Sequence, residues 1–197
     1  MTTIEGSLPG SAVRRRLREE TRALHEELEA RLDLLGPAVD LARYRGVLAA
    51  FLGWYEPVEA LLRDGPSPGL PPPPWSARLA ADLAALGLSG EAIRRLPRAT
   101  ALPRLDTEER RAGCLYVLEG AALGGGVIAR ALADRLGLHA GNGAAFFSGG
   151  GDAAGARWAA FLATLGHWRG APDAIVAAAR ETFVSLRDWL DRTGVLR

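Results

Sequence analysis

The sequence contains no lysine, so all 24 of its basic residues are arginines, and 23 acidic residues leave a net charge of +1. Without lysine, a P-loop phosphate site of the usual kind cannot form. The arginines are spread along the chain and form no basic stripe or tail. We therefore expect no nucleic-acid partner.

Cysteine and histidine are also scarce. The single cysteine, Cys114, has no partner for an internal disulfide and cannot build a thiolate metal site, so we interpret it as a buried structural thiol. The three histidines lack the spacing of a zinc site, and none has a glutamate three residues before it, as a di-iron carboxylate bundle requires. A G-x-S-x-G nucleophile elbow is missing too.

No hydrophobic segment is long and continuous enough to predict a membrane span. The longest apolar run, from Ala112 to Ala129, is interrupted by Glu119 and is rich in glycine. The beginning of the chain shows no signal-peptide pattern. We expect a cytoplasmic protein with no membrane partner.

Strand patterns are absent as well, because apolar residues recur at spacings of three and four. We predict an all-α, single-domain multihelical bundle over residues 1–197, with a disordered tail over 1–10 and a proline-rich connector over 64–75 within the domain. Residues 137–155 hold seven glycines and are expected to form a loop. Caps and stops predict helices from Ser11 to Gly36, from Asp40 through Leu62, near 76–86 and 90–95, from a capping box at Asp106–Glu109 to Gly137, and near 153–166 and 172–192.

The long helix before Gly137 carries four glycines near its middle: Gly120, Gly124, Gly125 and Gly126. Each glycine costs a helix about 1 kcal/mol relative to alanine. Such a cost is tolerated where the backbone must approach a flat partner closely or bend around it. The glycines do not follow a predicted strand, so they do not match the glycine motif of a dinucleotide-binding fold, which lies between a strand and a helix.

His25 is the only histidine inside a strongly amphipathic helix. Helical spacing places it beside Thr21 and Leu28 and predicts that it points to the apolar side. Glu29, four residues on, is spaced to accept one ring N–H, which leaves the other nitrogen free as a ligand. Arg22 and Arg18 precede it on the same side. An imidazole on an apolar face with a cationic end suits a flat apolar metal complex bearing carboxylates, which describes haem.

Each of these features also has a plainer interpretation. A lone histidine on an apolar face is often a satisfied core residue, and arginines on a helix often form a solvated face. Paired glycines such as Gly120 and Gly124 often mark helix packing. The indication of haem comes from the combination of a histidine on one helix and a bare backbone on another.

Two long motifs and a third segment resemble the haem oxygenases, and in particular the bacterial biliverdin-producing type that partners bacteriophytochromes. They are LREETRALHEELE (17–29), LYVLEGAALGGGVIAR (115–130) and FFSGGGDAAGARWAAFLATL (146–165). The likeness runs from about residue 12 to 190 and is weakest across the proline-rich connector.

The resemblance implies a role for individual residues. His25 would be the iron ligand, with Glu29 as its hydrogen-bond partner. Gly120 and Gly124, with Gly125 alongside, would belong to the distal helix whose backbone crosses the haem. The resemblance also implies that Arg18, Arg22 and Tyr116 lie near the propionates and that Phe183 lies at the haem edge. One departure is Ala121, because mammalian-type members have an aspartate directly after the first distal glycine.

The activity implied by the resemblance is oxidative opening of haem to biliverdin, with release of CO and ferrous iron. It would consume O₂ and reducing equivalents from a ferredoxin, a reductase or ascorbate, with cleavage at the α position and a bacteriophytochrome as biliverdin acceptor. Three alternatives remain. They are a non-catalytic haem carrier or sensor on the same fold, a thiaminase-like enzyme with a reactive cysteine, and a helical domain without a ligand.

Overall fold

A computed structural model describes residues 9–65, 71–149, 151–168 and 172–197. Within these ranges the chain forms helices and no strands, which confirms the all-α prediction. Most of the tail predicted over 1–10, and residues 66–70 of the proline-rich connector, lie outside the described residues. The helices are α1 (Pro9–Leu32), α2 (Leu41–Arg63), α3 (Trp75–Ala85), α4 (Gly90–Arg95), α5 (Glu108–Leu136), α6 (Ala145–Ser148), α7 (Gly151–Gly166) and α8 (Pro172–Arg192).

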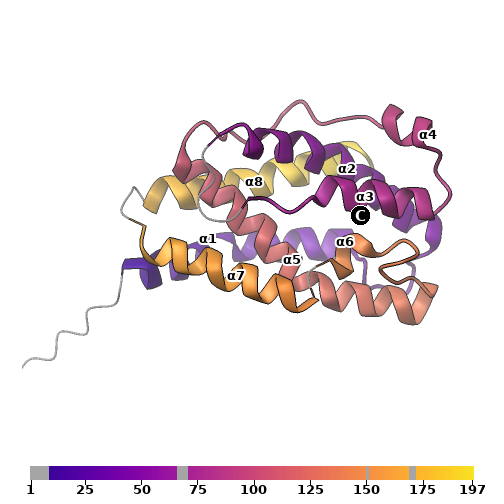
Figure 1. Cartoon of the computed structure of the whole chain (residues 1–197), viewed down its shortest axis with the longest axis horizontal. Coiled ribbons are helices and arrows are strands. Elements are labelled where there is room, and N and C mark those ends of the chain that lie inside the picture. The colour runs from indigo at the N-terminus through magenta and orange to yellow at the C-terminus, as the bar shows by residue number, and fades with distance from the viewer. Residues whose placement is uncertain (1–8, 66–70, 150, 169–171) are drawn as a thin grey trace, which may run out of the picture.

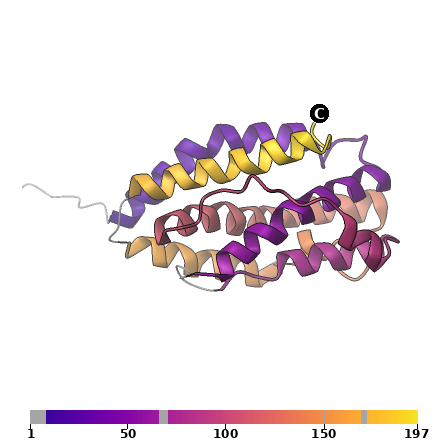
Figure 2. The ribbon, with the colours of Figure 1, turned by 90° about the horizontal axis from the view of Figure 1, so that it is seen from above.

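The long helices lie side by side around α5 (Figure 1). Seen from above, α1 and α8 form one side of the bundle, α3 and α7 form the other, and α5 runs between them (Figure 2). The most extensive packing joins α5 to α8, while α7 and α6 cover other parts of α5. By length and composition α5 could also cross a membrane, as the core helix of a bundle often can.

The helices begin and end close to the capping residues predicted from the sequence, but the starts of α1 and α5 differ from the prediction. Asp40 caps α2 as predicted, because its carboxylate accepts the N–H of Arg43 at 2.7 Å. The cap of α5 is Thr107 and not Asp106, with its hydroxyl accepting the N–H of Arg110 at 3.3 Å. Gly137 ends α5 in the left-handed conformation, at φ 66°. The predicted start of the first helix at Ser11 is also wrong, because α1 begins at Pro9 and Ser11 lies inside it.

The predicted loop over 137–155 is partly helical, because α6 forms within it and α7 begins at Gly151. Asp82 of α3 is buried, and its two carboxylate oxygens accept the N–H groups of Ala145 and Phe146 at 2.7 and 2.8 Å. These bonds satisfy donors at the start of α6 that a short helix otherwise leaves without partners. The anchor for α6 therefore comes from a residue more than 60 positions earlier.

Close approach of α5 to α8 depends on Gly113. A Cβ at this position would overlap the carbonyl oxygen of Ile175 and press on the Cβ of Ala178 at 2.8 Å. Further along α8, the indole of Trp189 donates to the carbonyl of Ala50 on α2 at 2.7 Å. These contacts hold α2, α5 and α8 as one core.

We expect Gly113→Ala to lower the free energy of unfolding by about 1–3 kcal/mol, because a methyl group there forces the two backbones apart. Gly126→Ala is the matched control, since a Cβ at Gly126 meets nothing within 4 Å. That control should raise stability by up to about 1 kcal/mol through helix propensity. Denaturant unfolding of both variants is the measurement, and a Gly113→Ala protein as stable as its parent would contradict the packing.

Candidate functional site

The candidate site lies between α1 and α5, two helices that share neighbours but make few direct contacts among the described residues. Tyr116 of α5 lies near Thr21 of α1, close enough for the Thr21 hydroxyl to lower the pKa of the phenol. From that point both helices run in the same direction in Figure 1. His25 is one turn beyond Thr21 and Gly120 one turn beyond Tyr116, so this register sets the imidazole opposite the glycine-rich part of α5.

His25 is more exposed than the sequence predicts. Its side chain is 51% exposed instead of turned into the apolar face, because Thr21 and Leu28 take the buried positions of α1. Nδ1 lies 3.4 Å from the Glu29 carboxylate, as the spacing predicts. The ring of Phe183 stands edge-on to the imidazole, with 6.0 Å between centroids. Glu29 and Phe183 orient the ring, and its second nitrogen, Nε2, is left for a ligand.

One face of α5 carries exposed apolar surface. Gly120, Leu123, Gly124 and Val127 share this face at helical spacing. Leu123 and Val127 are 49% and 64% exposed, which is unusual for large apolar residues in the middle of a helix. A Cβ at Gly124 would meet nothing within 4 Å, and one at Gly120 would make only ordinary contact with the Trp158 ring at 3.8 Å. We call Gly120, Leu123, Gly124 and Val127 the open face of α5.

Gly125 does not belong to the open face. A Cβ at this position would lie 2.7 Å from the carbonyl oxygen of Phe147, so its missing side chain lets α6 approach α5. Packing against α6 therefore accounts for Gly125 within the described residues, and its implied place beside the haem stays a prediction. A rotation of about 100° per residue explains why neighbours Gly124 and Gly125 face different partners.

The arginines at the start of α1 differ in whether they pair with an acidic residue or lie near Tyr116. Arg18 forms no ion pair with the described residues, and it and Arg14 are near enough to act electrostatically on the Tyr116 phenol. Burial raises the pKa of Tyr116, while Thr21, Arg14 and Arg18 partly oppose that rise. Arg22 instead lies 4.0 Å from Glu26 in an exposed pair. Arg18 and Tyr116 thus border the candidate site, and Arg22 is less well placed.

Glu119 helps to fix the position of the open face. This buried residue, which the sequence shows only as a charge in an apolar run, pairs with Arg157 of α7 at 2.5 Å. Arg157 also donates to the carbonyl of Pro71 at 3.0 Å. Removing either partner would leave a poorly solvated charge next to Gly120, which is strongly destabilising.

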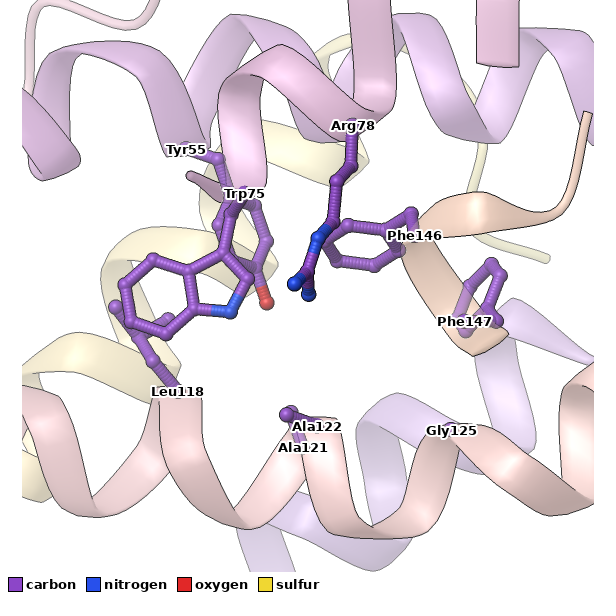
Figure 3. Close-up of a pocket in the computed structure, with 9 residues that line it drawn as sticks. All are labelled: Tyr55, Trp75, Arg78, Leu118, Ala121, Ala122, Gly125, Phe146 and Phe147. Atoms are coloured by element: carbon purple, nitrogen blue, oxygen red, sulfur yellow. The ribbon is translucent and has the colours of Figure 1, made fainter. Parts of the chain in front are cut away.

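The opposite face of α5 borders a small pocket (Figure 3). Ala121, Ala122 and Gly125 form its floor, and aromatic residues of α2, α3 and α6 form its walls. Arg78 of α3 reaches into it. Ala121, the position of the missing aspartate, therefore faces a space that already holds a cation.

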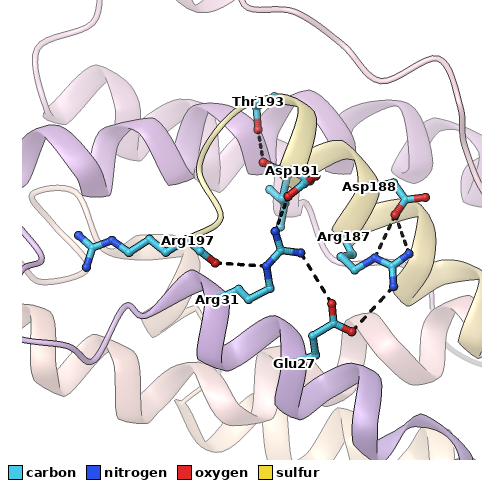
Figure 4. A network of polar contacts seen from close by, with 8 residues as sticks. Glu27, Arg31, Arg187, Asp188, Asp191, Thr193 and Arg197 are labelled. Atoms are coloured by element: carbon cyan, nitrogen blue, oxygen red, sulfur yellow. Dashed lines mark hydrogen bonds and ion pairs between the residues drawn. The ribbon is translucent and has the colours of Figure 1, made fainter.

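A network of ion pairs joins the end of α1 to α8 (Figure 4). Arg31 pairs with Asp191, and Glu27 lies between Arg31 at 3.7 Å and Arg187 at 3.8 Å. The N–H of Arg197 adds a backbone bond to the carbonyl of Arg31 at 3.0 Å. Exposed pairs are individually weak, but several on one helix end fix its orientation. This network holds the part of α1 that follows His25.

The sequence profile of the Heme oxygenase family matches residues 11–192, which is nearly the whole chain. The chain belongs to the heme oxygenase family. Members of this family bind haem as substrate and degrade it with O₂ and a reductant. Comparison with curated proteins finds none that matches.

The residues present fit the ligand of this family. The described residues contain no cluster of three or more His, Cys, Asp or Glu side chains that could hold a bare metal ion. They do provide one oriented imidazole, the open face of α5 and arginines at one end of the candidate site. A porphyrin needs these three features, because it brings four of its own iron ligands and carries propionates.

Sequence reasoning missed several residues of the heme oxygenase site. Arg14 and Trp158 border it, and Arg157 fixes it through Glu119. Arg157 and Trp158 lie inside the third segment that resembles the family (146–165), so the sequence did indicate that this part of α7 matters. Nothing in the local sequence distinguishes Arg14 from Arg15, which points elsewhere and pairs with Glu19.

Burial raises the pKa of all three tyrosines of the chain, Tyr44, Tyr55 and Tyr116. A free phenol ionises near about pH 10, so we expect little tyrosinate absorbance at that pH while the protein is folded. Because the folded-state pKa is higher than the unfolded one, stability should be retained below about pH 10 and fall above it. In denaturant the same residues should titrate normally. A tyrosinate step near about pH 10 in the folded protein would show that Tyr116 is solvated.

Proposed function

We propose that this protein is a haem oxygenase that opens haem to biliverdin and releases CO and ferrous iron, using O₂ and reducing equivalents. The observation that supports the proposal most directly is the register of His25 with the open face of α5. Family membership gives the reaction class. Bound haem would supply the iron and the ring that is opened.

The chain's own residues divide the work of binding and orientation. His25 would bind the iron through Nε2 while Nδ1–H donates a hydrogen bond to the Glu29 carboxylate, which would fix the tautomer and the ring orientation. Arg18 and Tyr116 would hold the propionates and so set the rotation of the haem in its plane, and the electrostatic effect of Arg18 on the Tyr116 phenol supports this pairing. The bare backbone at Gly120 and Gly124 would cover the other side of the ring and exclude bulk water.

Two other functions are weighed against this one. A haem carrier or sensor on the same fold is favoured by Ala121, which offers no acid beside the distal helix. The thiaminase-like alternative needs a reactive cysteine, but Cys114 is fully buried and burial raises the pKa of its thiol to about 12. Such a thiol stays protonated and inert at neutral pH.

The subtype and partners are further parts of the proposal. Residues 17–29 and 115–130 support the bacterial biliverdin-producing type, with a cytoplasmic location, a ferredoxin, reductase or ascorbate as electron donor and a bacteriophytochrome as acceptor. Analysis of the biliverdin isomer formed from haem is the test of this assignment. An isomer other than the α form would count against it.

Hemin added to the purified protein should give a Soret band that decays under ascorbate while a biliverdin band grows. His25→Ala should lose that Soret band and its turnover, because the other two histidines, His139 and His167, lie after the ends of α5 and α7. His139→Ala is the matched control, since His139 is exposed in the loop after α5. A stable Soret band under reductant would support the carrier or sensor, and an unchanged spectrum in His25→Ala would refute the proposed ligand.

A bulky residue at Gly124 should block haem while leaving the fold intact. Gly124→Leu would place its side chain on the open face, where a Cβ meets no protein atom within 4 Å. Gly126→Leu makes the same change on another side of the helix, with equally free space. We expect haem affinity to fall at least about tenfold for the first variant and little for the second, since about 1.4 kcal/mol of lost contact suffices. Equal affinities in a hemin titration would place the haem elsewhere.

A further inference from the structure

The pocket on the opposite face of α5 gathers hydrogen-bond donors from two helices. Arg78 and Trp75 lie three residues apart on α3, and Tyr55 comes from α2. Figure 3 shows the guanidinium, the indole nitrogen and the phenol oxygen pointing into the same space above Ala121 and Ala122. Tyr55 is only 3% exposed, so its hydroxyl is aimed into the pocket from the protein core.

The pocket carries a positive charge without a facing counter-charge. Arg78 is partly buried, and its side chain forms no ion pair or hydrogen bond with the described residues. The nearest acid along α3, Asp82, already has both oxygens engaged by the N–H groups at the start of α6. No carboxylate lines the pocket within the described parts of the chain. A partly buried guanidinium with no facing carboxylate among the described residues is a favourable place for a small anion, because it offers a charge-assisted hydrogen bond.

The donor set also favours an anion over a neutral molecule. A guanidinium and an indole can only donate, and burial raises the pKa of the Tyr55 phenol, so it keeps its proton and donates as well. Among the described lining residues the Tyr55 hydroxyl oxygen is the one side-chain acceptor, so a water bound here would have its oxygen satisfied but a side-chain acceptor for at most one of its two hydrogens. The empty space of the pocket is about 280 Å³, and this figure includes open solvent at the mouth. Only a small ligand fits.

We propose that Arg78, Tyr55 and Trp75 form a binding site for a small monovalent anion, of the size of formate, behind the glycine-rich helix. The guanidinium supplies the charge, and the phenol and indole supply directed hydrogen bonds. Ala121, Ala122 and Gly125 leave the space open because they are small. The site needs no haem, so its test is independent of the proposed function.

Formate binding to the haem-free protein is the experiment. The chain has five tryptophans, and the indole N–H resonance of Trp75 is identified by its loss in Trp75→Phe. Formate should shift that resonance saturably at constant ionic strength, maintained with gluconate, which is too large for the pocket. Formamide, similar in shape but neutral, should leave it unmoved. No shift with formate, or the same shift with formamide, would overturn the proposal.

Arg78→Gln should weaken formate binding at least about tenfold, since a charge-assisted bond becomes a neutral one. Arg94→Gln is the matched control, because Arg94 lies exposed on α4 and forms no ion pair with described residues. Ala122→Leu is the second variant and fills the pocket from α5 while all three donors remain. It should abolish the formate shift, with folding checked by the other four indole signals. Retained binding in both variants would place the anion elsewhere.

Discussion

α5 meets its neighbours backbone to backbone at two places, against Ile175 of α8 at Gly113 and against Phe147 of α6 at Gly125. Both contacts require the absence of a side chain, and together they fix where the helix lies and how it is rotated. With those two sides committed, the stripe from Gly120 to Val127 remains uncovered by the described residues. The open face is thus a geometric consequence of how the helix is packed.

The glycines of α5 therefore serve different purposes. At Gly113 and Gly125 the missing side chain is compensated by close packing, which offsets a helix-propensity cost of about 1 kcal/mol each. Gly124 has no such compensation within the described protein, because nothing lies within 4 Å of where its Cβ would be. Gly126 is equally open but lies on another side of the helix. In the function proposed above, the open backbone at Gly124 is explained by a flat haem that faces His25 and must come close.

The sequence was informative where structure depends on local spacing, and less so where it depends on distant residues. The cap at Asp40, the end of α5 at Gly137 and the His25–Glu29 pair all follow from neighbours within a turn or two. The formation of α6 depends on Asp82 of α3, so the sequence of 137–155 suggested only a loop. The different roles of Gly124 and Gly125 depend on the rotation of α5, which α6 and α8 set together.

Ala121 and Arg78 are best understood as a pair. An aspartate at position 121 would put a carboxylate into the same pocket as the Arg78 guanidinium, and the two would neutralise each other within the protein. With alanine there, the guanidinium has space in front of it and no facing counter-charge. The departure from the mammalian-type pattern thus does more than remove an acid, since it leaves an unbalanced positive charge in a pocket that shares α5 with the open face. Whatever polar environment the distal side of the haem requires would here be organised by a cation and two neutral donors.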